Sequence, residues 1–150
     1  MNMKQIKRCD SCERGATLVE FSIAVTVFLI SVFGVIEFGR ALWVHNALTD
    51  AARRGARYAT LHTAAQVGEV KNVVVYGDPA GGTQALVPNL TTANVTVSYS
   101  NMAVNKGSVS VGITDYQFQF VIPLIGTNIT MPAYSTTLTG ESVGIIPANK

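Results

Sequence analysis

The sequence predicts an α+β protein in which one long N-terminal transmembrane helix precedes a small antiparallel β-sheet domain. Residues 16–36 form an apolar run of 21 residues, long enough to cross a hydrocarbon core of about 30 Å. Residues 37–60 contain no proline and many good helix formers, so the helix should continue beyond the apolar run. Several later segments alternate apolar and polar residues with a period of two, which is typical of half-buried strands.

These patterns divide the chain into three expected parts. Residues 1–15 form a polar leader, residues 16–64 form the transmembrane helix and its continuation beyond the membrane, and residues 65–150 form the antiparallel β domain. The leader contains more basic than acidic side chains, and basic residues that flank a span stay on the cytoplasmic side. We therefore expect a single-pass protein with a cytoplasmic N-terminus and with residues 41–150 outside.

The composition suits a membrane-anchored protein better than a free enzyme, because only 13% of residues are charged and 48% are apolar. Four of the 11 Lys and Arg and two of the nine Asp and Glu lie in residues 1–15, so the rest of the chain is neutral. A neutral chain gives no support for a nucleic-acid partner. Residues 32–37 lack the small-x-small pattern of a signal-peptidase site, so the apolar run reads as an anchor.

No pattern in the sequence indicates catalysis or metal binding. Cys9 and Cys12 form a Cys-x-x-Cys pair in the leader, but no second pair or nearby histidine completes a zinc site. His45 and His62 are isolated, and no phosphate-binding loop or nucleophile elbow is present. We expect no catalytic residue, no metal and no cofactor, and hence a protein that is not an enzyme.

The start of the apolar run contains a candidate processing site and a candidate contact residue. Gly15 ends the charged leader and the apolar run begins at Ala16, which suggests cleavage between them. Glu20 is the single charge in the run. A charge at the centre of a span costs roughly 2.5–3.5 kcal/mol on insertion scales and usually has a partner. Two explanations stay open: Glu20 extends to the cytoplasmic interface, or it meets a positive charge on a neighbouring chain, such as the new amine of Ala16.

The outer half of the helix contains further candidates. Glu37 and Arg40 are three residues apart and are expected to form a pair at the outer edge of the span, with a structural or a functional role. Trp43 has the position of an aromatic-belt residue that anchors the span. Small residues recur every three or four positions and would allow close packing, either at a subunit interface or against the chain's own β domain: Ala51, Gly55 and Ala59.

In the β region, the apolar parity changes between Ile113 and Tyr116, which predicts a bulge or tight turn at Thr114–Asp115. The short apolar run Val73–Tyr76 ends at a glycine-rich turn. The alternating segments predict strands near residues 95–99, 109–113, 116–120 and 129–138.

Two stretches resemble the TadE-like family of the tight-adherence (Flp) pilus system. Residues 14–21, Arg-Gly-Ala-Thr-Leu-Val-Glu-Phe, are similar to the Gly-then-Glu-Phe processing site of that pilin class. Residues 34–40 and 47–59 form the second stretch, and residues 120–125 give weaker support. The leader's Cys-x-x-Cys and the divergent β region depart from the family pattern.

The resemblance implies a minor pseudopilin that assists assembly of Flp pili and adhesion. It implies cleavage between Gly15 and Ala16 by an aspartate prepilin peptidase at the cytoplasmic side of the bacterial inner membrane, with the β domain in the periplasm. It also implies that Glu20, together with Phe21, contacts the N-terminus of another subunit. The expected partners are prepilin peptidase, other pseudopilins, pilus assembly components and inner-membrane lipid. The alternative is an uncleaved, signal-anchored periplasmic or surface binding protein.

Overall fold

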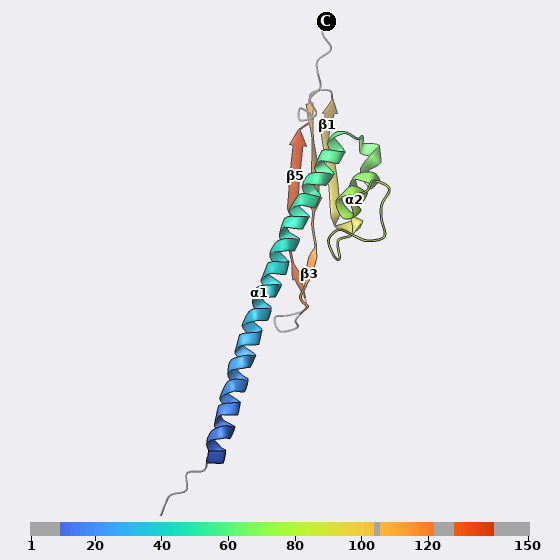
Figure 1. Ribbon diagram of the computed structural model, residues 1–150. Coiled ribbons are helices and arrows are strands. Elements are labelled where there is room, and N and C mark those ends of the chain that lie inside the picture. The colour runs from blue at the N-terminus through green and yellow to red at the C-terminus, as the bar shows by residue number, and fades with distance from the viewer. Residues whose placement is uncertain (1–9, 104–105, 122–127, 140–150) are drawn as a thin grey trace, which may run out of the picture. The chain divides into compact units, whose positions relative to one another are not determined.

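The computed structural model describes residues 10–103, 106–121 and 128–139. Helix α1 extends from Asp10 to Thr60 and is followed by helix α2, from Val67 to Tyr76 (Figure 1). Short 3₁₀ helices, η1 and η2, precede α2 and the first strand. An antiparallel sheet follows the helices, so the predicted α+β class is confirmed.

The strands form two antiparallel sheets. Strands β1 (Val95–Ala103), β2 (Lys106–Ile113) and β5 (Tyr134–Thr139) make a three-stranded sheet in the order β1-β2-β5. Strands β3 (Gln117–Gln119) and β4 (Asn128–Thr130) pair only with each other among the described residues. We call this pair the β3–β4 ribbon.

The chain forms two compact units, Met1–Gly39 and Arg40–Lys150, and α1 contributes to both. In the second unit, the later part of α1 packs with α2 on one face of the three-stranded sheet, and α2 contacts β1 (Figure 1). Both helices and the sheet contribute buried residues to the core: Val44, Leu48, Ala52 and Ala56 of α1; Val70, Val74 and Val75 of α2; and Val95, Val109, Val111 and Ile113 of the sheet.

The opposite face of the sheet carries hydroxyl side chains, because successive residues of a strand point to opposite faces. Ser98 lies opposite Ser110 in the β1–β2 register, and Ser110 lies opposite Thr137 in the β2–β5 register. Thr137 Oγ1 donates a hydrogen bond of 3.1 Å to Ser110 Oγ. The period-two patterns therefore place the valines in the core and the hydroxyls on the outer face.

The bend between β2 and β3 agrees with the expected tight turn, since Asp115 has a left-handed φ of 56°. The expected single strand over residues 129–138 is wrong. Its first part belongs to β4 and its second part to β5, which lie in different sheets. Pro132 stands between them, and proline has no backbone N–H with which to continue a strand ladder.

The apolar run Val73–Tyr76 forms the last turn of α2, inside the region expected to be an antiparallel β domain. Valine has only modest helix propensity, but Val70, Val73 and Val74 are buried, and burial in the core outweighs that preference. The helix ends at Gly77, which has a φ of 81° and whose N–H donates to the Val73 carbonyl at 3.0 Å.

Candidate functional site

The candidate processing site lies within α1. The helix begins at Asp10, so Gly15 and Ala16 are helical and exposed, whereas the sequence predicted a helix starting at Ala16. Glu13 and Arg14 are good helix formers and no proline intervenes, which explains the earlier start. A Cβ added at Gly15 would meet no atom within 4 Å, so the chain itself places no steric limit on this position.

Glu20 and Phe21 lie one helical turn further along, on the surface of the first unit. Both are exposed, and Phe21 is 65% exposed. The large apolar neighbours Leu18 and Ile23 are 67% and 62% exposed. Glu20 therefore sits among exposed apolar side chains, a setting in which a partner has access to the carboxylate.

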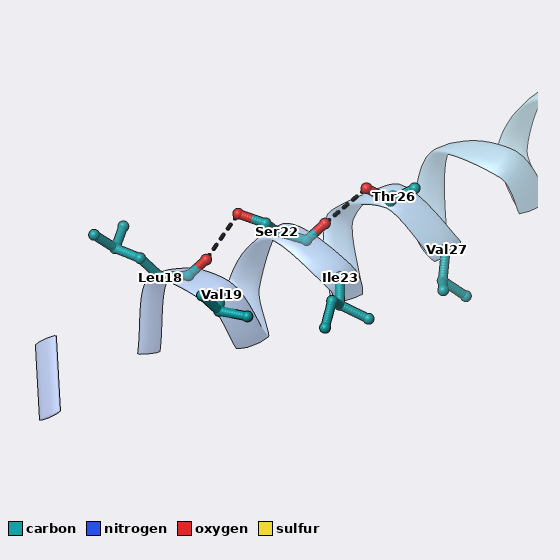
Figure 2. A pocket seen from close by; sticks show the side chains of 6 residues that line it. All are labelled: Leu18, Val19, Ser22, Ile23, Thr26 and Val27. Carbon is teal, nitrogen blue, oxygen red and sulfur yellow. Dashed lines mark hydrogen bonds between the residues drawn. The ribbon is translucent and has the colours of Figure 1, made fainter. Parts of the chain in front are cut away.

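The polar residues of this apolar segment satisfy their own hydrogen bonds. Ser22 Oγ donates to the Leu18 carbonyl at 2.8 Å, and Thr26 Oγ1 donates to the Ser22 carbonyl at 2.7 Å (Figure 2). Figure 2 shows the apolar side chains Val19, Ile23 and Val27 along the side of the helix away from these hydroxyls. A hydroxyl group that donates a hydrogen bond to a carbonyl of the preceding turn adds little to the free-energy cost of placing the helix in an apolar environment. Glu20 is thus the one strongly polar group of the segment.

Among the helices that the structure describes, α1 alone is long and apolar enough to span a membrane, and none of its most apolar stretch is buried in the protein. The finding is consistent with a single-pass anchor. The second unit, in contrast, buries the later part of the same helix in its own core.

The predicted interfacial residues differ in their surroundings. Glu37 is 6% exposed and is the one buried charged side chain among the described residues. Arg40 lies over the ring of Phe118, with its guanidinium carbon 4.3 Å from the ring centre, and donates a hydrogen bond to the Gln119 carbonyl. Trp43 is 55% exposed on the same helix. Arg40 therefore fixes β3 beside the beginning of the second unit's helix.

Two tyrosines extend this set of contacts and were not singled out from the sequence. His45 Nδ1 lies 2.8 Å from the Tyr134 hydroxyl, and Tyr116 donates a hydrogen bond of 2.7 Å to the Pro88 carbonyl. Burial raises the pKa of both tyrosines; for Tyr116 the positive charge of Arg40 partly opposes that rise. These contacts join residues far apart in the sequence, so no local pattern could have revealed them.

The small residues Ala51, Gly55 and Ala59 are buried in the core of the second unit. A Cβ added at Gly55 would lie 2.2 Å from Val74 Cγ2 and 3.3 Å from Val111 Cγ1. The structure thus places these small residues against the chain's own domain, the second of the two possibilities that the spacing left open.

No cluster of three or more potential metal ligands occurs in the described part of the chain. Cys9 lies outside the described residues. The candidate site therefore consists of the Gly15–Ala16 bond, the exposed carboxylate of Glu20 and the apolar helix surface around it.

One comparison with known proteins finds a similarity in this segment. A family model described as TadE-like protein matches residues 15–57, which include Gly15, Ala16, Glu20 and all the buried core residues of α1 except Ala59. The match confirms the resemblance to the TadE-like family that was seen in the sequence, and it covers the first part of the chain only. No curated protein and no solved structure matches the chain.

Proposed function

We propose, from the TadE-like character of residues 15–57, that the protein is a minor pseudopilin in the assembly of Flp pili. The observation that carries the proposal is the exposed apolar surface of α1 around Glu20, within the matched segment. Such a surface suits a helix that lies in lipid and then packs against helices of other subunits. The hydroxyl-bearing β domain, which the family match does not cover, would face the periplasm.

The proposed topology places the N-terminus in the cytoplasm and the second unit in the periplasm. The basic residues Lys4, Lys7 and Arg8 precede the span and support this orientation. A phosphatase fused after Lys150 should be active in the periplasm. An inactive phosphatase fusion together with an active cytoplasmic reporter at the same site would reverse the orientation.

Maturation is proposed to occur by cleavage between Gly15 and Ala16 by prepilin peptidase. Because this bond lies inside α1, the peptidase would have to unwind the helix locally, and glycine lowers the cost by about 1 kcal/mol relative to alanine. N-terminal sequencing of protein from cells with the native peptidase should give Ala16. A chain that starts at Met1, or beyond Phe38, would contradict the proposal.

A matched pair of substitutions tests the specificity of processing. Gly15→Leu should block cleavage because a narrow peptidase cleft has no room for the larger side chain. Gly39→Leu is the control: a Cβ at Gly39 also meets no atom within 4 Å, so the change adds similar bulk to α1 away from the scissile bond. Equal processing of both variants and the native chain would exclude cleavage at Gly15.

Glu20 is proposed to pair with the new amine of Ala16 on a neighbouring subunit. In a low-dielectric layer, removing one partner leaves the other charge unpaired, at a cost of roughly 3–5 kcal/mol. Glu20→Gln should therefore leave insertion and cleavage intact but impair pilus assembly and crosslinking to partner pseudopilins. Asp50→Asn, which neutralises an exposed carboxylate in the second unit, should have no such effect. Normal assembly and crosslinking of Glu20→Gln would leave Glu20 as an interfacial residue of the anchor.

The alternative is an uncleaved, signal-anchored binding protein. The hydroxyl-bearing outer face of the three-stranded sheet favours it, because Ser98, Ser110 and Thr137 could offer hydrogen bonds to a polar ligand. The two functions differ at the N-terminus. The binding protein retains Met1 in the membrane-extracted form, whereas the pseudopilin begins at Ala16.

A further inference from the structure

The β3–β4 ribbon lies in an unusually uncharged part of the chain. No Asp, Glu, Lys or Arg occurs between Asp115 and Glu141. Both strands of the ribbon fall within this stretch. A charge-free stretch of this length is unusual for a water-facing surface, where charged side chains are normally interspersed.

Exposed apolar side chains lie on the ribbon and just after its first strand. Val121, two residues after the end of β3, is 74% exposed, and Ile129 of β4 is 49% exposed. Residues 122–127 lie outside the described part of the chain. Val121 and Ile129 are therefore the side chains on which the inference rests.

Contacts within the second unit fix the position of the ribbon along α1. The Arg40 guanidinium covers the ring of Phe118 and donates a hydrogen bond to the Gln119 carbonyl. Val121 follows Gln119 by two residues. Figure 1 shows β3 beside this part of α1. Arg40 follows the apolar run 16–36 by four residues, which is about 6 Å along a helix at ~1.5 Å per residue. Within the second unit, the ribbon thus lies beside Arg40, the first residue of that unit.

The residues of α1 that follow Arg40 are of the kinds found at a membrane interface. Leu42 and Trp43 are 49% and 55% exposed there. Tryptophan is enriched at the headgroup level, where its apolar ring and polar N–H are both satisfied. Transfer of exposed valine and isoleucine side chains from water to the interfacial layer is favourable, and the ribbon carries no charged side chain that would oppose that transfer.

We propose that the β3–β4 ribbon is a second membrane contact, in which Val121 and Ile129 enter the interfacial layer of the leaflet from which α1 emerges. The partner is lipid. The inference rests on the membrane anchoring included in the proposed function. Two separate contacts, a helix and a ribbon, would restrict rotation and tilt of the second unit at the membrane surface.

The test uses the full chain with Cys9→Ser and Cys12→Ser, reconstituted into lipid nanodiscs that contain spin-labelled phospholipid. Single cysteines at Val121 and at Ile129 carry an environment-sensitive fluorophore. Leu61→Cys is the matched control, because Leu61 is 69% exposed and apolar but lies 21 residues beyond Arg40, about 31 Å along the chain at the ~1.5 Å helical rise. Val27→Cys, within the apolar run, reports the anchor itself.

We expect lipid quenching at residues 121 and 129 to exceed that at residue 61 at least threefold, with a blue-shifted emission, and quenching at residue 27 to be strong. Strong quenching at 27 with equal, weak quenching at 121, 129 and 61 would overturn the ribbon contact while keeping the anchor. Absence of quenching at 27 would overturn the anchoring and the inference with it. Crosslinking between copies through 121 or 129 without lipid quenching would replace lipid by a second copy as the partner.

Discussion

The two halves of α1 share one backbone conformation but have opposite surroundings. Before Arg40, large apolar side chains such as Leu18 and Phe28 are 67% and 65% exposed. After Arg40, Leu48 and Ala51 have no exposed surface at all. The first half of the helix thus exposes its apolar side chains, whereas the second half buries its apolar side chains in the core of its own domain.

Side-chain size follows the same division. The exposed half contains bulky residues such as Phe21 and Phe28, whereas the buried half presents Ala51, Gly55 and Ala59 to the core. Bulky side chains increase apolar contact with lipid, and small ones allow α1 to approach α2 and β2 closely. A candidate membrane span and a core segment can therefore be distinguished within one uninterrupted helix by exposure together with residue size.

The largest expected difference between the halves concerns the stability of the second unit. Leu48→Ala removes a fully buried side chain and should lower the free energy of unfolding by about 2–5 kcal/mol. Leu29→Ala, at a side chain 44% exposed in the other half, should leave it unchanged. Thermal or denaturant unfolding in detergent would measure both. Equal losses would mean that the two halves contribute to one common core.

The second difference concerns membrane insertion. Val27→Asp places a charge near the centre of the apolar run and should cost roughly 2.5–3.5 kcal/mol of insertion. Asn46→Asp introduces the same charge on the exposed surface of the other half and should cost nothing measurable. The fraction of protein that resists alkaline carbonate extraction reports the result. Full retention of Val27→Asp in the membrane would argue against lipid around this half.

A glycine pair provides a third comparison. The methyl group of Gly55→Ala would lie 2.2 Å from Val74 Cγ2. Overpacking costs about 1–3 kcal/mol and better helix propensity returns about 1 kcal/mol, so a net loss of up to about 2 kcal/mol is expected. Gly34→Ala meets no atom within 4 Å and should gain helix propensity alone. The unfolding midpoint of the second unit should therefore fall for the first variant and hold for the second.

The smallest expected effect is a response to alkaline pH that is confined to the second unit. Burial raises the pKa of Tyr99, Tyr116 and Tyr134 above the ordinary value near 10. Above about pH 10 the unfolded chain loses protons that the folded chain still holds, so stability should be complete below that pH and decline gradually as pH rises through the folded-state pKa values.

Circular dichroism during alkaline titration of the solubilised protein would separate the two halves. Sheet signal and near-ultraviolet tyrosine signal should decline first, while the helix signal of the first unit persists. Tyr99→Phe sharpens the test, because the Tyr99 hydroxyl is buried and has no hydrogen-bond partner among the described residues. Removal of this hydroxyl should reduce the loss of folding stability at alkaline pH and should raise the stability at neutral pH. A steeper alkaline loss in this variant would contradict the assignment.

The sequence by itself determined the elements whose signal is local. An apolar run of 21 residues requires a nonpolar medium, and alternating valines require a sheet with one buried face, so the α+β class followed from periodicity. Gly15 and Glu20 were also proposed from a local pattern, and both lie in the continuous segment that is similar to the TadE-like family. The parity change near Asp115 also located a turn correctly.

Tertiary structure decided whatever depends on residues that meet across long separations. The valines of α2 are helical because the core buries them, and the last strand divides at Pro132 because its two parts join different neighbours. Arg40 contacts a carbonyl 79 residues away, and His45 contacts a hydroxyl 89 residues away. Such contacts form only after loops close and layers pack, and their free energy, which no local pattern encodes, places the β3–β4 ribbon beside the start of the second unit's helix.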